Sequence, residues 1–179
     1  MSPDILSVGY AVRRVWTPSA GELHQLAAVL IDCVEGGASV SFMRPLSMPK
    51  ALSYWRAIAD GVGRGERALL VAEDESGVIG TTQLVLDQPE NQPHRADLAK
   101  MLVHRRARRR GVGAALLRAA EDLARDCAKP LLVLDTASDD AERLYERQGW
   151  RRCGVIPGYA LLPDGGLCAT TYLYRELSD

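Results

Sequence analysis

Three arginines and two glycines between residues 108 and 113 form a turn with the composition of a phosphate-binding site. The order is Arg-Arg-Arg-Gly-Val-Gly, after an apolar segment that ends at Val103. The first N–H groups of a helix lack intrahelical acceptors and carry a partial positive charge, so they attract anions. Glycine lets a ligand approach the backbone, and guanidinium groups reach the outer phosphate oxygens. If a helix follows, the turn predicts a site for a diphosphate.

The elements around this turn strengthen the prediction, because basic turns with glycine are also common in surfaces that bind nothing. A strand is expected over 96–103, and the helix after the turn has its apolar residues on one face: Leu116, Leu117, Ala120, Leu123 and Cys127. A buried strand over 131–135 follows, and a short helix over 141–149 ends at a glycine. The predicted order is therefore strand, phosphate-binding turn, helix, strand.

The turn and the segment 141–150 together resemble the GNAT superfamily of acetyl-coenzyme A dependent N-acetyltransferases. There an Arg-x-x-Gly-x-Gly motif binds the pyrophosphate, and an Ala-x-x-x-Tyr-x-x-x-Gly-aromatic motif flanks the thioester. The resemblance implies that Met101 and Val103 hold the pantetheine arm where two parallel strands part, with the Val103 N–H facing the thioester oxygen. It implies that the pyrophosphate meets the backbone amides of Arg108, Arg109, Arg110, Gly111, Val112, Gly113 and Ala114.

Ser138 marks a departure from the superfamily pattern. It stands where many members have an asparagine that contacts the coenzyme. A serine hydroxyl is shorter, but it can still cap the following helix or bind a ligand. Ser138 is therefore kept as a candidate coenzyme contact.

Four further segments are similar to the tabtoxin-resistance type of acetyltransferase, which acetylates the amine of a small amino-acid-like β-lactam. They are residues 36–42, 134–136, 157–159 and 163–165. The likeness implies an α/β (α+β) GNAT fold with a mixed, mostly antiparallel sheet, parallel and splayed strands at 96–103 and 131–135, and helices on both faces. It also implies direct transfer of an acetyl group from acetyl-CoA to the primary amine of a toxin or metabolite. Acetylation of peptide or protein N-termini and non-catalytic acyl-CoA binding are the alternatives.

Tyr145 and Asp135 are the candidate catalytic residues, because direct transfer needs a neutral amine and a proton for the departing thiolate. Tyr145 matches the superfamily position beside the sulfur, and a phenol with an ordinary pKa near 10 keeps its proton at neutral pH. The alternative is a tyrosine that only packs on its helix. Asp135 follows an apolar strand and is the candidate base if burial raises its pKa; otherwise it orients and attracts the cation. The alternative is a cap of the next helix through Thr136 and Ser138.

Acceptor contacts are expected in the connection after the first helix, on the hairpin and its exit, and in a late loop. This fold forms its acceptor cleft from those segments, and acidic groups there would attract an amine. Each residue singly also fits an ordinary surface, capping or packing role. The candidates are Glu35, Ser39, Ser41, Phe42, Gln83, Asp87 and Tyr159.

The bulk properties fit a single N-acetyltransferase domain over residues 1–179. The formal net charge is −1, so neither a nucleic-acid nor a membrane partner is expected. The four cysteines lack Cys-x-x-Cys spacing and the three histidines are dispersed, which favours reduced thiols and no metal site. The N-terminal ten residues do not have the pattern of a signal peptide, and no apolar run approaches about 18 residues. We therefore expect a cytoplasmic location, and exposed strand edges make a homodimer an expectation.

The remaining elements follow from hydrophobic spacing and turn residues. A first strand is expected over 8–16, a helix before Gly36, and a second helix from near Ser47. An antiparallel hairpin and two closing strands complete the sheet, over residues 69–73, 78–86, 150–156 and 169–176.

Two other classes of protein compete with this interpretation. The five arginines between 105 and 110 suggest a nucleic-acid-binding module, but they lack interleaved aromatic residues and a basic surplus elsewhere. A dinucleotide-binding oxidoreductase would need a third glycine where Leu116 stands.

Overall fold

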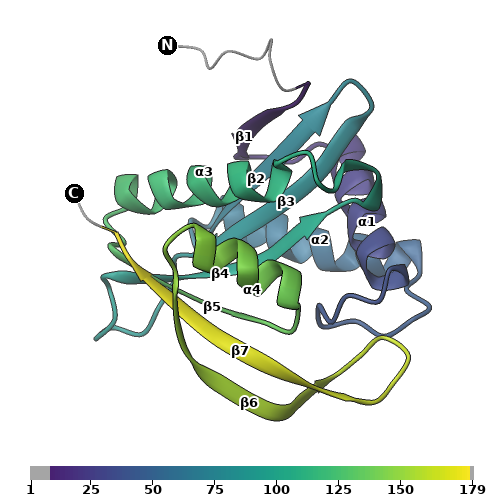
Figure 1. Cartoon of the computed structure of the whole chain (residues 1–179). Helices are drawn as coiled ribbons and strands as arrows, with labels where there is room; N and C mark the ends of the chain where they lie inside the picture. The colour runs from purple at the N-terminus through teal and green to yellow at the C-terminus, as the bar shows by residue number, and fades with distance from the viewer. Residues whose placement is uncertain (1–8, 178–179) are drawn as a thin grey trace.

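The computed structural model describes residues 9–177 and places seven strands in one sheet, in the order β1-β2-β3-β4-β5-β7-β6 (Figure 1). Every neighbouring pair is antiparallel except β4 and β5, which run parallel. The strands are β1 (Ala11–Val15), β2 (Arg67–Asp74), β3 (Gly77–Val85), β4 (Arg95–Val103), β5 (Leu131–Thr136), β6 (Arg151–Leu161) and β7 (Leu167–Glu176).

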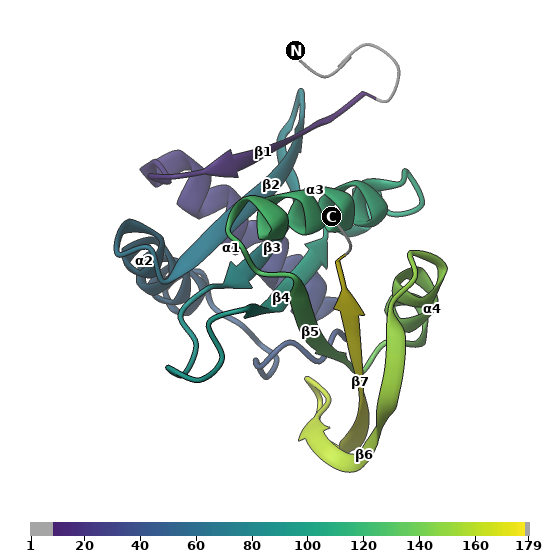
Figure 2. The same cartoon turned by 90° about the vertical axis from the view of Figure 1, so that its left-hand side faces the viewer.

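Helices cover both faces of the sheet because side chains alternate between its faces along the strands. On β2, Leu69 and Val71 pack against α1 and α2, whereas Ala68 and Leu70 belong to the core under α3. Figure 2 shows the same two layers, with α1 and α2 on one side of the sheet and α3 and α4 on the other. The helices are α1 (Ala20–Glu35), α2 (Met48–Gly63), α3 (Val112–Asp126) and α4 (Asp139–Arg147).

Three of the four helices begin with a serine cap. The Ser19 and Ser47 side chains accept from the third residue of their helices, and Ser138 does so for α4. At the start of α3 stands Gly111, in the left-handed region at φ 78°, and no side chain caps that helix. The N–H groups of the first turn of α3 are therefore left for a ligand or solvent.

Strands β4 and β5 pair over only three residues and then part. Arg95, Ala96 and Asp97 pair with 131–133, and no pairing continues beyond them. A register shift between β3 and β4 near Lys100, which has φ 52°, bends β4 at the point of separation. The bend leaves one edge of β4 unpaired over its last residues.

This architecture confirms the expected α/β fold, with a mixed sheet, a splayed parallel pair and helices on both faces. Some boundaries differ from the expectation. Strand β6 continues to Leu161 because an irregularity between Ile156 and Ala160 absorbs Pro157 and Gly158. Within the described residues the first strand begins at Ala11, and residue 8 of the expected strand lies outside them. No helix among residues 9–177 is long and apolar enough to cross a membrane.

Candidate functional site

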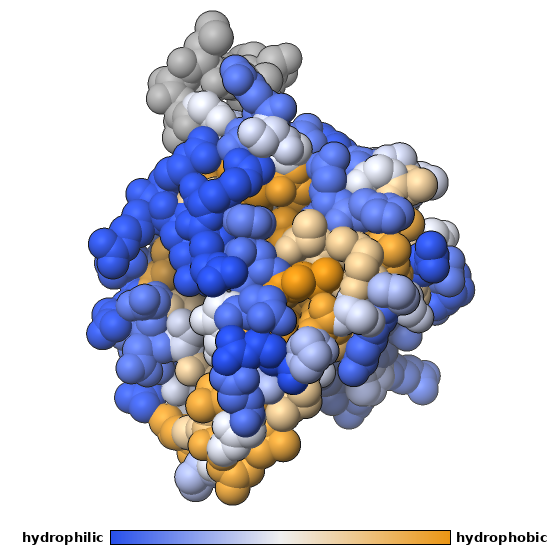
Figure 3. Space-filling view, turned by 90° about the vertical axis from the view of Figure 1, so that its right-hand side faces the viewer, coloured by the Kyte–Doolittle hydropathy of each residue, from blue (hydrophilic) through white to orange (hydrophobic). Residues whose placement is uncertain are grey.

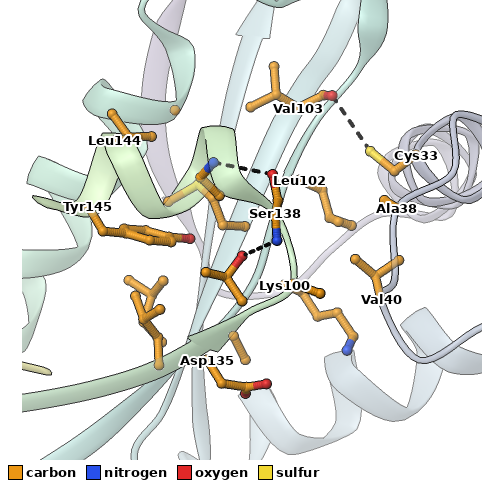
Figure 4. A pocket seen from close by; sticks show the side chains of 18 of the residues that line it. Cys33, Ala38, Val40, Lys100, Leu102, Val103, Asp135, Ser138, Leu144 and Tyr145 are labelled. Atoms are coloured by element: carbon orange, nitrogen blue, oxygen red, sulfur yellow. Dashed lines mark hydrogen bonds between the residues drawn. The ribbon is translucent and has the colours of Figure 1, made fainter. Parts of the chain in front are cut away.

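A cavity of about 1730 Å³ opens where β4 and β5 separate (Figure 4). It runs from the loop before α3, past the ends of both parallel strands, to the segment after α1. Helix α4 forms part of its wall. The cavity brings together the glycine-arginine turn, Tyr145 and Asp135, which lie far apart along the chain.

The first turn of α3 forms one end of the cavity. The bond from Ala115 N to Gly111 O, of 3.0 Å, is the first of the helix, so the N–H groups of Val112, Gly113 and Ala114 have no intrahelical acceptor. All three residues line the cavity. At Gly113 a Cβ would lie 3.1 Å from the Leu144 side chain, so glycine there also lets α4 pack closely. Unpaired donors at a helix N-terminus match the chemistry of a diphosphate, and this end of the cavity fits that part of a coenzyme.

The five arginines between residues 105 and 110, before and within the turn, fall into two groups. Arg105 pairs with Asp32 at 2.9 Å, and Arg106 and Arg110 pair with Asp74 at 2.9 and 3.1 Å. Hydrogen bonding from Arg106, helped by Arg110, lowers the pKa of Asp74 to about 2. These pairs tie the turn to α1 and to the β2–β3 hairpin.

Arg108 and Arg109 line the cavity instead. Two of the five guanidiniums thus remain beside the α3 N-terminus, where they can reach an anion bound there. The arginine cluster is therefore less available to nucleic acid, because three of its five guanidiniums are paired with two carboxylates, Asp32 and Asp74.

The unpaired edge of β4 contributes Met101 and Val103 to the cavity. The His104 N–H bonds to Ile79 O on β3 at 2.8 Å. Successive N–H groups of a strand point to opposite edges, so the Val103 N–H points toward the gap. The Val103 carbonyl lies 3.6 Å from the Cys33 thiol, which donates to it (Figure 4). The Val103 N–H is thus a backbone donor at the unpaired edge of β4, whereas the Val103 carbonyl already accepts from Cys33.

Tyr145 is buried in α4, with 3% of its surface exposed, and its hydroxyl points into the cavity (Figure 4). Its ring packs against Trp150 at a centroid distance of 5.7 Å. Burial raises the pKa of the Tyr145 phenol, and the negative charge of Asp135 raises it further. The phenol therefore stays protonated near neutral pH and is a proton donor, not a base, under these conditions.

Asp135 lies near the end of β5 and is exposed. Thr170 Oγ1 donates to its Oδ2 at 2.7 Å, which fixes the carboxylate at the cavity wall. Solvent stabilises a charged carboxylate in this position, which suits attraction of an ammonium group better than removal of its proton. Asp135 does not cap α4, since Ser138 Oγ accepts from Ala141 N at 3.2 Å and Thr136 Oγ1 accepts from Ser138 N.

Ser138 also lines the cavity, so its hydroxyl combines a capping role with a position beside the expected coenzyme site. The hydroxyl proton is not used in the cap, because the Oγ atom acts there as an acceptor. It remains a candidate donor to a ligand.

The expected acceptor residues are divided between two neighbouring cavities and the surface. Ser39, Ser41 and Phe42 line the large cavity, and Tyr159 joins them in a smaller one of about 270 Å³. Tyr159 shares a hydrogen bond of 2.9 Å with the Tyr172 hydroxyl.

Glu35, Gln83 and Asp87 do not line either cavity. Asp87 is exposed, and the carbonyl of Glu35 accepts from Arg44 at 2.9 Å. Gln83 is buried in the sheet, where it donates to Tyr54 and accepts from Arg67. These three residues therefore lie outside the cavities in which an acceptor could bind beside Tyr145 and Asp135.

Sequence reasoning missed several polar residues of the cavity, among them Arg67, Lys100 and Tyr54. Lys100 did carry a signal, because a lysine inside the apolar run Leu98–Val103 must find a polar surrounding. Arg67 and Tyr54 carried no such signal in the sequence. Their place in the cavity depends on the pairing of β2 within the sheet and on the packing of α2 against it.

Within residues 9–177 no group of three or more histidine, cysteine, aspartate or glutamate side chains is arranged to hold a metal ion. The four cysteines are free thiols.

Comparison with known proteins identifies the family. A family model described as the acetyltransferase (GNAT) family matches residues 39–150. The chain is 30% identical, over 126 residues, to an Azospirillum brasilense protein described as an uncharacterized N-acetyltransferase in the hisH-hisA intergenic region. That alignment covers 69% of this chain and 73% of the relative.

Solved structures share the fold at lower identity. A ribosomal-protein-alanine N-acetyltransferase from Brucella melitensis superposes with a TM-score of 0.79 at 23% identity, covering 93% of this chain and 99% of its own. A phosphinothricin acetyltransferase from Sinorhizobium meliloti, solved with acetyl-CoA, gives 0.77 at 19% identity, with coverage of 95% and 89%.

Proposed function

The chain belongs to the acetyltransferase (GNAT) family and is an acetyl-CoA-dependent N-acetyltransferase, and from that premise we propose that it acetylates the primary amine of a small amino-acid-like molecule. The acceptor is a toxin of the β-lactam kind or a metabolite. The tabtoxin-type segments 36–42 and 134–136 support a small acceptor, because both line the large cavity. The Sinorhizobium meliloti protein of the same fold is likewise named for a small-molecule acceptor.

The observation that carries the proposal is the continuity of the cavity from the uncapped α3 N-terminus to the Tyr145 hydroxyl. We propose that the amides of residues 111–114, with Arg108 and Arg109, hold the coenzyme diphosphate. The Val103 N–H and the backbone of Met101 then bind the pantetheine arm along the free edge of β4, and Ser138 donates to the coenzyme from the other side. The coenzyme supplies the activated acetyl group.

Tyr145 and Asp135 divide the proton chemistry in this proposal. The Tyr145 phenol, which is protonated at neutral pH, points into the cavity and donates its proton to the leaving thiolate. Asp135 attracts the acceptor ammonium and orients it, and water carries its proton to solvent. Ser41 and Phe42 contact the acceptor from the loop after α1.

The test is a thiol-release assay with acetyl-CoA and a panel of amino acids, small amines, aminoglycosides and dipeptides. We expect release only in the presence of a small amino-acid-like acceptor, with the acetylated amine identified by mass spectrometry. Preference for peptides, or binding of acetyl-CoA without turnover of any amine, would contradict the proposal.

We also propose that the protein is a cytoplasmic homodimer. Free cysteines support the location. For the dimer, the edge strand β6 and its hairpin with β7 expose apolar side chains, of which Leu167 is 71% exposed. Figure 3 shows apolar surface at the lower end of the molecule, which is the height of this hairpin in Figure 1. The molar mass in solution should be twice that of the chain and should fall to the monomer value in Leu167→Arg.

A further inference from the structure

The acceptor end of the cavity contains two cations that form no ion pair within residues 9–177. Lys100 on β4 and Arg67 at the first position of β2 both line it. The Lys100 ammonium donates to Ser41 Oγ at 2.8 Å, and Arg67 Nη1 donates to Gln83 Oε1 at 3.1 Å. An ammonium has three N–H donors and a guanidinium five. Most donors of both groups therefore have no acceptor in the described part of the protein.

Among the described residues, the two aspartates nearby form no ion pair with Lys100 or Arg67. Asp97 accepts from Arg95 at 2.5 Å and from Gln88 at 3.1 Å, and Asp135 accepts from Thr170. Burial lowers the pKa of Lys100, the charge of Asp135 opposes that effect, and the charge of Arg67 adds to it. Lys100 and Arg67 thus repel each other in a partly buried place, and an anion between them would relieve the repulsion and accept hydrogen bonds from their remaining donors.

Lys100 lines the same cavity as the proposed catalytic residues, Tyr145 and Asp135. Lys100 directly precedes Met101 at the bend of β4, and the same cavity end is influenced by the charge of Asp135. Figure 4 shows Lys100 and Asp135 projecting from neighbouring strands into the same region. An α-amino acid has its amine and carboxylate one carbon apart, so it can direct the amine toward Asp135 and the carboxylate toward Lys100. Phe42 and Tyr54, in edge-to-face contact at 5.2 Å, provide an apolar wall for its side chain.

We propose that Lys100 and Arg67 bind the carboxylate of the acceptor, so that the substrates are amino acids whose carboxylate is free. The inference rests on the proposed function and narrows it, because a peptide or protein N-terminus has an amide in place of that carboxylate. Lys100 and Arg67 are specificity-determining residues in this account.

The first experiment compares pairs of acceptors that differ only in this group. Free L-amino acids and their carboxamides are assayed by thiol release with the wild type, Lys100→Met, Arg67→Met and the conservative variant Lys100→Arg. Methionine is unbranched at Cβ, so Lys100→Met keeps a side chain that tolerates the same backbone. Dividing the acid-to-amide ratio of kcat/KM in the wild type by that in each variant cancels the difference in amine basicity between acids and amides.

We expect the wild type to prefer the acids and Lys100→Met to reduce that preference about 10- to 100-fold, as for loss of a hydrogen bond to a charged group. Arg67→Met should act in the same direction, and Lys100→Arg should restore most of the preference. The matched control is Lys129→Met, which removes the same charge outside the cavity and should leave the ratio unchanged. Equal use of acids and amides by the wild type, or an unchanged ratio in Lys100→Met, would overturn the inference while leaving the acetyltransferase assignment intact.

A second measurement does not depend on turnover. Calorimetric titration of the coenzyme-free protein with N-acetyl-L-amino acids and their carboxamides should show tighter binding of the acids, lost in Lys100→Met. If no amine is acetylated, the proposed function fails, and this titration alone decides whether the carboxylate site exists. Equal affinity for acids and amides would overturn it.

Discussion

At the scale of single residues, Tyr145 and Asp135 face the same cavity with different exposure to solvent. The phenol is buried and its pKa is raised, whereas the carboxylate is exposed to solvent. The difference in exposure is the basis for the two roles that we propose, proton donor for Tyr145 and attractor of the acceptor cation for Asp135.

Replacing Tyr145 with phenylalanine should lower kcat at saturating acceptor by at least about tenfold, since general acid catalysis contributes about 10²- to 10⁴-fold and water replaces part of it. The phenol makes no hydrogen bond within residues 9–177, so the free energy of unfolding should change by less than about 0.5 kcal/mol. Steady-state kinetics and urea unfolding of Tyr145→Phe measure the two quantities.

The pH dependence gives an independent check on Tyr145. Burial, and the charge of Asp135, raise the folded pKa of Tyr145 above its unfolded pKa near 10, so the phenol is protonated in the folded protein below pH 10. The stability that the protonated phenol contributes is present below pH 10 and is lost as pH rises through the folded pKa. The rate of the wild type should therefore show no decline from this group up to pH 10. A decline near pH 8 to 9 that disappears in Tyr145→Phe would show that the phenol is not held protonated as described.

Replacing Asp135 with asparagine should lower kcat/KM for the amine about tenfold and leave the affinity for acetyl-CoA within about twofold, because the carboxylate acts on the acceptor's charge. Thr170→Val is the matched control, since it removes the 2.7 Å hydrogen bond but keeps the carboxylate. Full activity of Asp135→Asn would remove this residue from the account.

At the scale of elements, the N-terminus of α3 differs from those of the other three helices because no side chain caps it. Helices α1, α2 and α4 have serine caps, and α3 has a glycine with no capping side chain. A cap would occupy N–H donors that a phosphate needs, so the uncapped helix end supports the phosphate site that we propose there.

Substitution of Ala114 separates stability from binding. An aspartate in the first turn of a helix is favourable to the helix dipole, yet it would repel a diphosphate at the same place. Ala114→Asp should thus preserve or raise the thermal midpoint and weaken acetyl-CoA binding at least about tenfold by calorimetry. The neutral variant Ala114→Asn has nearly the same size and should bind within about threefold of the wild type; equal losses in both would mean crowding instead of charge.

The ion pairs of Asp74 hold the arginine turn against the hairpin and predict an acid-sensitive element. With a folded pKa of about 2 and an ordinary value of 3.8, Asp74 contributes stability that is present above pH 4 and is lost as pH falls through 2. The urea midpoint of Asp74→Asn should lie below that of the wild type at pH 5, and the two should converge toward pH 2. Asp126→Asn, at an exposed position outside the turn, should show no such convergence; a constant difference for Asp74→Asn would exclude this linkage.

The same elements show what sequence alone can predict. Apolar stripes and glycines located α1, α2, α3 and the hairpin, because those signals are local. The ion pairs of Asp32 and Asp74 with the turn span 32 to 73 residues, and no local pattern specifies them. The placement of Lys100 beside Arg67 also depends on the bend in β4, and the outward position of Asp87 depends on where β3 ends.

At the scale of the whole molecule, one cavity connects two regions of positive charge whose side chains form no ion pair among residues 9–177. The α3 end has backbone donors with Arg108 and Arg109, and the opposite end has Lys100 with Arg67. Asp135 and Tyr145 lie along the same cavity. This arrangement explains how a chain with a net charge of −1 can present local sites for anionic groups.

The most direct test of the account is a crystal structure of the protein with bound coenzyme A. We predict the diphosphate within hydrogen-bonding distance of the amides of residues 111–114, the pantetheine arm along the free edge of β4 at Val103, and the sulfur beside the Tyr145 hydroxyl. Coenzyme bound elsewhere, or a diphosphate held only by side chains away from the α3 N-terminus, would contradict it.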